Sequence, residues 1–136
     1  MRNMTLIAAT LAFGLTGALT GAAAAAEGLK DEAEIRDGLL VVGMAYEISE
    51  KCGEIDARTF RGIQTLLNLK SRARELGYSS SEIDAYVDDK VEKKRLEGIA
   101  RGMLVQLGVT PGVEETYCQV GRDQIAKNSG VGRLLR

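Results

Sequence analysis

Glycines and helix-capping residues divide most of this chain into segments with the period of an α-helix, and no other feature constrains its fold as strongly. Three of the four predicted helices end at a glycine, namely Gly53, Gly77 and Gly108. Glycine adopts the left-handed conformation of a helix C-terminus without steric cost. No stretch combines sustained apolar–polar alternation with β-branched residues, which is the pattern of a strand. The sequence therefore predicts an all-α fold.

Each predicted helix begins at a residue whose side chain can accept a hydrogen bond from a free backbone N–H. The predicted starts are Asp31 (a capping box with Glu34), Asp56, Ser79 (a capping box with Glu82) and Thr110, which is followed by Pro111. Ile55 is expected to pack on Phe60 as a hydrophobic staple. Tyr78 is expected to pack on Ile83 in the same way. The helices should end near Cys52, Gly77, Gly108 and Asn128.

The spacing of apolar residues predicts which faces are buried. The first predicted helix carries two apolar stripes, one formed by Ile35, Leu39, Val42 and Tyr46, the other by Val41, Ala45, Ile48 and Cys52. Two stripes indicate burial on two sides, so this helix should be central. The second helix has an apolar face that we expect to join the core, formed by Phe60, Ile63, Leu66, Leu67, Ala73 and Leu76.

The third predicted helix, over 80–107, loses its apolar period at Lys93, Lys94 and Arg95. We expect a kink or a break near 92–96, and both alternatives stay open. The result is a small bundle of four or five helices.

Residues 1–26 have the three-part layout of a secretory signal peptide. One positive charge is followed by an apolar stretch over 4–19 and an alanine run that ends at Ala26, and the first acidic residue is Glu27. A transmembrane anchor is the alternative, but the apolar stretch is shorter than the roughly 20 residues that span a bilayer. We therefore expect cleavage near Ala26, a single helical domain over 27–136 without a transmembrane segment, and a periplasmic location.

Export to an oxidising compartment predicts that Cys52 and Cys118, the two cysteines of the chain, form a disulfide. In the chain-entropy model a bridge across a loop of this length contributes roughly 4 kcal/mol. The alternative is a redox-active pair, but catalytic dithiols usually occur as C-x-x-C. A structural disulfide is the favoured interpretation.

The composition excludes several kinds of chemistry. The chain has no His, so it has no Ser-His-Asp triad, no Cys-His pair and no zinc site with His ligands. A net charge of −1 lacks the excess of positive charge that is typical of proteins that bind nucleic acid. Gly130 and Gly132 do not extend to the G-x-G-x-x-G pattern of dinucleotide binding. We therefore predict no catalytic residue and no cofactor, and we expect that the protein is not an enzyme.

One acidic face offers a weak candidate for a cation. Asp84, Asp88 and Glu92 share a face of the third predicted helix. Calcium sites usually include loop carbonyls and more oxygen ligands than three helical carboxylates supply. The favoured alternative is a solvated helix face without a metal.

Charge is distributed unevenly between the two ends of the predicted domain. Residues 27–50 carry seven acidic against two basic residues, and residues 121–136 carry four basic against one acidic. The two ends could dock on each other. Our hypothesis is instead that residues 129–136 form a mobile tail, in which Arg133 and Arg136 reach a partner or anionic headgroups. The alternative is a tail packed on the core.

Three sequence motifs resemble a known family: CGEIDAR at 52–58, LGYSSSEI at 76–83 and YCQVGRDQI at 117–125. They are similar to small secreted alphaproteobacterial proteins grouped as a domain of unknown function, over nearly the whole of 27–136. The resemblance implies an exported helical protein with both cysteines retained. No activity is established for this family, so the resemblance implies no catalytic residue. Arg58 and Arg122 lie near the two cysteines in sequence and are the candidate polar residues, with a structural salt bridge favoured over a ligand contact.

These observations predict a non-catalytic structural or interaction protein of the periplasm, whose partner is another protein. One specific form of this role is an accessory subunit of an inner-membrane complex, for example NADH:quinone oxidoreductase. The alternatives are a periplasmic stress chaperone and a small-ligand-binding helical protein. No residue in the sequence selects among these partners.

Overall fold

The computed structural model describes residues 28–136, so the predicted signal peptide lies outside the described residues. The helical elements are α2 (Ala33–Lys51), α3 (Thr59–Glu75), α4 (Ser80–Asp88), α5 (Lys90–Gln106), α6 (Glu114–Ala126) and the 3₁₀ turn η1 (Gly132–Leu134). Over this part of the chain the only β pairing is an isolated bridge between Ala57 and Leu135. The predicted all-α fold is confirmed.

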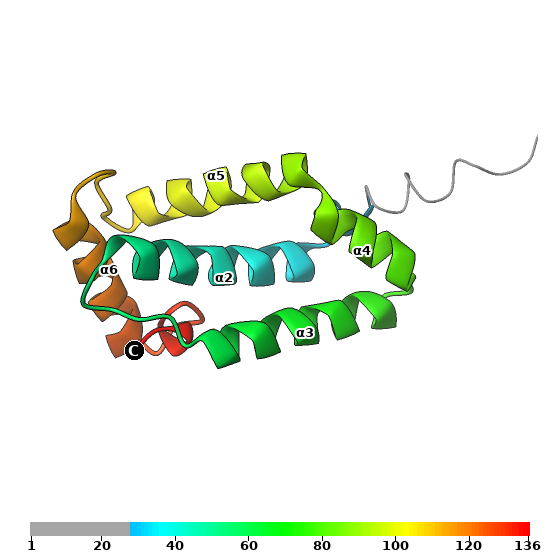
Figure 1. Cartoon of the computed structure of the whole chain (residues 1–136), viewed down its shortest axis with the longest axis horizontal. Coiled ribbons are helices and arrows are strands. Elements are labelled where there is room, and N and C mark those ends of the chain that lie inside the picture. The colour runs from blue at the N-terminus through cyan, green and yellow to red at the C-terminus, as the bar shows by residue number, and fades with distance from the viewer. Residues whose placement is uncertain (1–27) are drawn as a thin grey trace, which may run out of the picture.

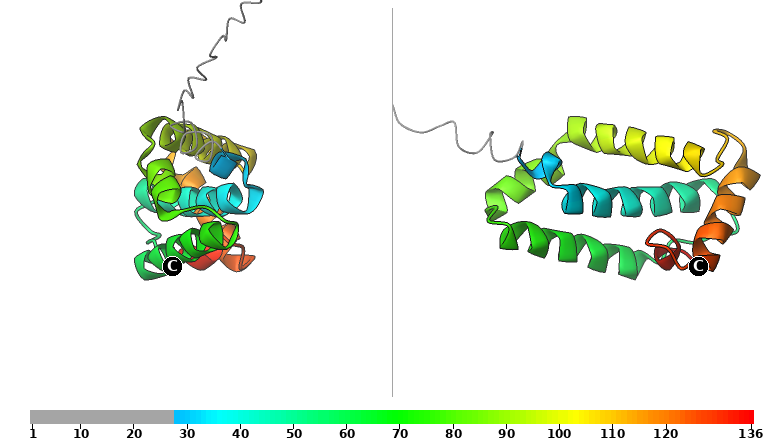
Figure 2. Two further views of the ribbon diagram at one scale, coloured as in Figure 1. Left: turned by 90° about the vertical axis from the view of Figure 1, so that its right-hand side faces the viewer. Right: turned by 180° about the vertical axis from the view of Figure 1, so that it is seen from behind.

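Three long helices lie side by side, with α2 between α3 and α5 (Figure 1). The short helix α4 connects α3 to α5 at the N-terminal end of α2, and α6 crosses the opposite end (Figures 1 and 2). Because α2 packs on α3, α5 and α6, the prediction of a central first helix is confirmed.

The buried residues form two separate clusters along α2. The smaller one, which we call the α4 core, contains Leu29, Ile35, Ala73, Ile83 and Tyr86. The larger one, the disulfide core, joins the rest of α2 to α5, α6 and the C-terminal tail, and its fully buried side chains include Ile48, Leu104 and Leu135. Two of the side chains that flank these clusters, Leu39 and Val42 of α2, are only partly buried.

The capping box at the start of α4 is confirmed. The Ser79 hydroxyl accepts a hydrogen bond from the Glu82 N–H at 3.2 Å, and the Glu82 carboxylate accepts one from the Ser79 N–H at 2.6 Å. Ile83 belongs to the α4 core and the partly buried Tyr78 packs against that core, as the predicted staple requires.

The caps predicted at Asp31 and Asp56 are wrong. Helix α2 follows Glu32 and α3 follows Arg58, and neither start has a side-chain cap. Asp56 instead exchanges two backbone hydrogen bonds with Arg136, each 2.9 Å long, and this extended pairing delays the start of α3. Phe60 is consequently exposed, so its predicted staple with Ile55 does not form.

The predicted helix ends are correct at two of the three glycines. Gly77 and Gly108 have left-handed backbone conformations, with φ of 100° and 117°. Gly53 does not adopt one. Helix α2 ends with an extended Cys52, and the Gly53 N–H donates to Glu114 at 2.9 Å.

The third predicted helix is broken, but at Asp89 rather than near 92–96. The Asp89 carboxylate accepts hydrogen bonds from the N–H groups of Val91 and Glu92, at 2.8 and 3.0 Å, and thereby caps α5. The run from Lys93 to Arg95 lies inside α5.

The last long helix also begins later than predicted. Residues 111–112 form a turn, Gly112 has a φ of 81°, and α6 follows Val113 instead of Thr110. The Thr116 hydroxyl accepts a hydrogen bond from the Thr110 N–H at 2.9 Å, which closes the turn before the helix.

The C-terminal tail is packed on the core, so the hypothesis of a mobile docking tail is wrong. Val131, Leu134 and Leu135 are buried in the disulfide core. A Cβ on Gly132 would lie 1.9 Å from the Gln124 carbonyl oxygen. Gly132 therefore permits a close backbone approach to α6 and is not a flexible joint.

Candidate functional site

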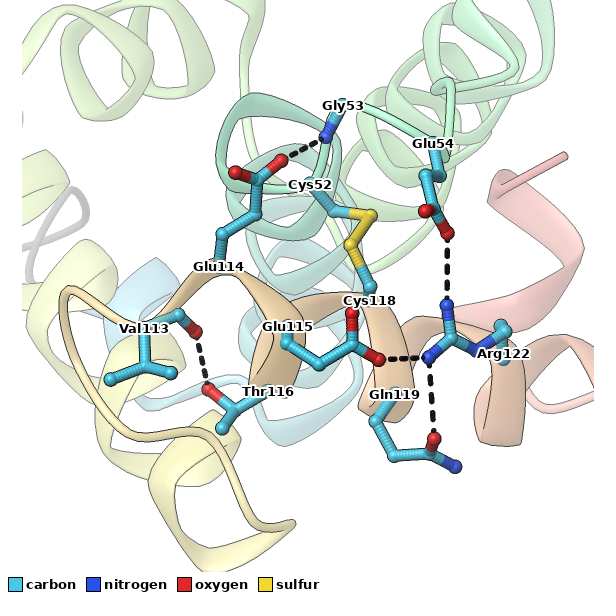
Figure 3. Close-up of a disulfide and its surroundings, with 10 residues drawn as sticks. All are labelled: Cys52, Gly53, Glu54, Val113, Glu114, Glu115, Thr116, Cys118, Gln119 and Arg122. Carbon is cyan, nitrogen blue, oxygen red and sulfur yellow. Dashed lines mark hydrogen bonds and ion pairs between the residues drawn. A yellow bond between two sulfur atoms is a disulfide. The ribbon is translucent and has the colours of Figure 1, made fainter.

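The predicted disulfide is present and joins the end of α2 to the middle of α6 (Figure 3). The Cα atoms of Cys52 and Cys118 are 5.2 Å apart, and both residues are buried. Burial keeps reductants and thiols away from the bond, which fits a structural role better than a redox-active one.

Arg122, one of the predicted polar residues, lies beside the disulfide in a cluster of ion pairs (Figure 3). Its guanidinium pairs with Glu54 at 3.0 Å and with Glu115, and it donates to the Gln119 side chain at 3.3 Å. These contacts tie the loop after α2 to α6. The interpretation of Arg122 as a structural salt bridge is the one that the geometry supports.

The other predicted arginines lie around the tail instead. Arg58 Nε donates to the Leu135 carbonyl at 2.8 Å, and Arg133 donates to the Asn128 carbonyl at 2.9 Å. Arg136 pairs with Asp56 through its backbone. Arg58 and Arg122 therefore contact different groups and do not form one site.

The candidate cation face at Asp84, Asp88 and Glu92 is not assembled. Asp84 pairs with Lys70 at 2.8 Å, and Glu92 lies beyond the break, bonded to Arg95 at 2.6 Å. Among residues 28–136 no group of three or more His, Cys, Asp or Glu residues is arranged to hold a metal ion. The break at Asp89 separates Asp88 from Glu92, and this removes the common helix that the prediction required.

An open groove of ≈ 720 Å³, which we call the apolar groove, lies between α2, α3, α4 and α5. Its floor is the stripe of α2 formed by Ile35, Leu39, Val42 and Tyr46. Its walls are α3, through Ile63, Leu66 and Leu67, and α5, through Leu96 and Ala100. Tyr86 and Val87 of α4 close one end.

Charged pairs line the edges of the apolar groove. The Lys70–Asp84 pair lies where α3 meets α4, and Arg101 of α5 pairs with Glu47 of α2 at 3.2 Å. These pairs hold the walls and floor together. At least one partner of each pair is exposed to water, so each pair contributes about 1 kcal/mol to stability.

A buried polar network closes the α4 end of the groove. The Tyr86 hydroxyl donates to the Glu92 carboxylate at 3.3 Å, and two nitrogens of Arg95 donate to the same carboxylate. Burial, reinforced by the charge of Glu92, raises the pKa of Tyr86 to about 12. The hydrogen bond from Arg95 lowers the pKa of Glu92. The tyrosine is therefore neutral and the glutamate charged across the physiological range.

The sequence analysis does not predict the apolar groove, because apolar stripes of this kind usually face a protein's core. A usable signal was present in the apolar faces themselves. The first predicted helix has two stripes and the second has a full one. A bundle of only four or five short helices has too few neighbours to cover all three. The lining of the groove is mainly apolar side chains from α2, α3, α4 and α5.

Comparison with known proteins adds a family and no activity. None of the helices between residues 28 and 136 combines the length and the apolar character that crossing a membrane requires. No curated protein and no solved structure matches this chain. The model of one family, DUF5333, a family of unknown function, matches residues 27–136. The chain belongs to the DUF5333 family.

Proposed function

We propose that this protein is an exported, non-catalytic interaction protein that holds an apolar segment of a partner protein in its apolar groove. The observation that carries the proposal is the exposure of large apolar side chains on the groove surface. Tyr46 is 60% exposed and Leu67 is 56% exposed, although both belong to stripes that would normally be buried.

The exposed side chains are grouped, and grouping distinguishes a binding surface from ordinary surface composition. Single exposed apolar residues are common on soluble proteins, whereas contiguous apolar patches with polar rims usually mark interaction sites. Here three helices contribute to one patch, and the pairs Lys70–Asp84 and Arg101–Glu47 lie at its edges. Covering it would release about 25 cal/mol for each Å² of apolar surface removed from water.

The scaffold around the groove is suited to holding a partner. The disulfide and the ion pairs of Arg122 fix the C-terminal end of α2, the helix whose stripe from Ile35 to Tyr46 forms the groove floor. A preformed groove binds more tightly than a mobile one, because less conformational entropy is lost on binding.

The leader predicted over 1–26 supports a periplasmic location for this binding. A partner there is another exported protein or the periplasmic side of an inner-membrane complex. One specific form of this role is an accessory subunit of such a complex, for example NADH:quinone oxidoreductase.

The test is site-specific photo-crosslinking in the native host. A photo-reactive amino acid is placed at position 67, inside the groove, or at position 105, where Val105 is 48% exposed on α5 but outside the groove. We expect one discrete crosslinked protein from position 67 and none from position 105. The same product from both positions, or none from either, would refute the proposal.

A stress chaperone is the second candidate, and one observation favours it. Phe60 is 81% exposed and lies outside the groove lining, so apolar surface is not confined to the groove. A chaperone would give crosslinks to many proteins from position 67, and it would suppress aggregation of an unfolded client. A single crosslinked partner would exclude this role.

A further inference from the structure

We infer that, in the absence of its partner, this protein pairs with a second copy of itself, and that each copy inserts α3 into the apolar groove of the other. The inference goes beyond the proposed function, because it concerns the protein before a partner binds. Four observations support it: the exposure of α3, the directions of the helices, the area of the groove face and the charges along it.

Helix α3 leaves nearly all of its apolar side chains uncovered within its own chain. Over Thr59–Glu75 the one buried residue is Ala73. Phe60, Ile63 and Leu67 are all exposed, and spacings of three and four residues place them on one face. Phe60 lies outside the groove lining, so a short segment bound in the groove does not cover it. A second copy covers the whole stripe, because α3 enters the other groove as a helix.

Helix α3 runs from the α6 side of the molecule to the α4 side, antiparallel to α2 and α5 (Figure 1). A two-fold axis across the groove reverses this direction in the second copy. It brings Phe60, at the start of each α3, to the α4 end of the other groove, where Val87 is 66% exposed. Within one chain the 17 residues of α3, about 25 Å of helix, separate Phe60 from α4. A contact between Phe60 and Val87 therefore reports two copies.

The face that contains the groove is large enough for a dimer. It consists of α3, α2 and α5 side by side, each about 10 Å wide, and α3 and α5 have 17 residues each. The face thus measures about 30 Å by 25 Å, or about 750 Å². A standard protein interface covers about 800 Å² on each partner. Since interfaces of this area start at micromolar affinity, we expect a dissociation constant on the order of 10 µM, weak enough for a partner to displace the second copy.

The charges of the groove suit a second copy. Its lining has four carboxylates against three cations, so the two copies do not repel each other there. On the α6 side of the groove, Glu47 and Glu97 share a single cation, Arg101, at 3.2 and 4.0 Å. Arg74, exposed near the end of α3, makes no ion pair within residues 28–136. The antiparallel arrangement brings Arg74 of each copy towards these two carboxylates of the other, which favours association.

The first experiment measures the molecular mass of the disulfide-bonded protein by sedimentation equilibrium between 0.5 and about 200 µM, a range that brackets the expected dissociation constant. We expect monomers at the low end and mostly dimers at the high end. Denaturation experiments below 1 µM therefore report on the monomer. A protein that is monomeric throughout this range would refute the inference.

Matched variants assign the dimer to α3 and the groove. Phe60→Ser and Leu67→Gln should each weaken association about tenfold, whereas Val105→Gln, at an exposed position of α5 outside the groove lining, should leave it unchanged. Arg74→Glu should weaken association about fivefold, and adding Glu97→Arg to that variant should restore most of it. Melting temperatures show that each variant is folded. A dimer that Phe60→Ser and Leu67→Gln leave intact would place the interface elsewhere and refute the inference.

The second experiment tests the direction of the two copies. A photo-reactive amino acid at position 60 is activated in a mixture of ¹⁴N- and ¹⁵N-labelled protein. We expect crosslinks between labelled and unlabelled chains that map to α4 and the start of α5, which position 60 does not reach within one chain. Crosslinks that map only to α6 or the tail would refute the antiparallel arrangement.

The outcomes separate the inference from the proposed function. A protein that stays monomeric, yet gives a discrete crosslink to another protein from position 67 in the host, refutes the dimer and supports the proposed function. A dimer with the expected crosslinks from position 60, together with crosslinks from position 67 that join only two copies of this chain, supports the inference and refutes the proposed function.

Discussion

Two faces of helix α2 lie in different environments. The face with Leu40, Met44 and Ile48 is enclosed by α5, α6 and the tail, and a disulfide at the end of the helix holds it there. The stripe from Leu39 to Tyr46 lies along the apolar groove and is only partly covered. The same helix thus has one apolar face that is satisfied within the chain and another that is not. The difference shows that amphipathic pattern determines where apolar faces form, while the number of available helices determines which of them are covered.

Truncating the tail should cause the largest loss of stability, because it opens the disulfide core that encloses one face of α2. Removing residues 131–136 takes away Val131, Leu134 and Leu135, each buried and each worth about 1.5–3 kcal/mol. The expected loss of about 5 kcal/mol or more equals the whole stability of many domains, so the truncated protein should melt far below the intact one by circular dichroism. Arg133→Ala, at an exposed position of the tail, is the control and should change little. A melting temperature within a few degrees of the intact protein would show that the tail is not part of the core.

Removing the disulfide should have the next largest effect. The double variant Cys52→Ala/Cys118→Ala should lose about 2–5 kcal/mol of unfolding free energy, because the bridge restricts a long loop in the unfolded chain. Urea denaturation of both proteins measures this difference. Adding a reductant should destabilise the native protein to a similar extent and leave the double variant unchanged. Equal urea midpoints for the two proteins would contradict the prediction.

The buried network at the closed end of the groove predicts a loss of stability in alkali. The pKa of Tyr86 is about 12 in the folded protein and about 10 when unfolded, so its contribution is complete below about pH 10. It is lost as the pH rises from about 10 to 12, a change on the order of 2 kcal/mol. Tyr86→Phe should show a shallower loss in urea denaturation over that range. The same slope for both proteins would exclude Tyr86 as the cause.

Polar substitution in the groove should have the smallest effect on stability. Leu67→Gln should change the unfolding free energy by less than about 0.5 kcal/mol, because Leu67 is already exposed. Leu104→Ala, in the disulfide core, should cost about 2–5 kcal/mol. Chemical denaturation of both variants compares the two regions directly. A loss of several kcal/mol from Leu67→Gln would show that the groove is part of the folded core rather than a free surface.

Local signals in the sequence predicted the fold class, the α4 capping box and the disulfide correctly. Ser79 and Glu82 interact within one turn, so their spacing alone specifies the contact. Asp56 has an equally good capping side chain, but its backbone pairs with Arg136, eighty residues later in the chain. That tertiary pairing overrides the local preference, and it is not visible from the neighbouring residues.

The candidate sites were predicted less well, for two physical reasons. Asp89 caps α5 through its side chain and separates Asp88 from Glu92, and a competing cap inside a charged run is hard to distinguish from a solvated face. Gly132 has the sequence context of a flexible joint, yet it is required for close contact with α6. Glycine permits both mobility and close packing, and only the neighbouring backbone decides between them.

The division of buried residues into two clusters has a consequence for native-state amide hydrogen exchange. The α4 core is small and lies far from the disulfide, so its helix has few buried contacts that must break before its amides exchange. The amides of α6, beside Cys118, are protected by the larger cluster and by the covalent link. We therefore expect the amides of α4 and the adjoining turns to exchange before those of α6. Because α4 closes one end of the groove, we expect such an opening to widen the entrance without global unfolding.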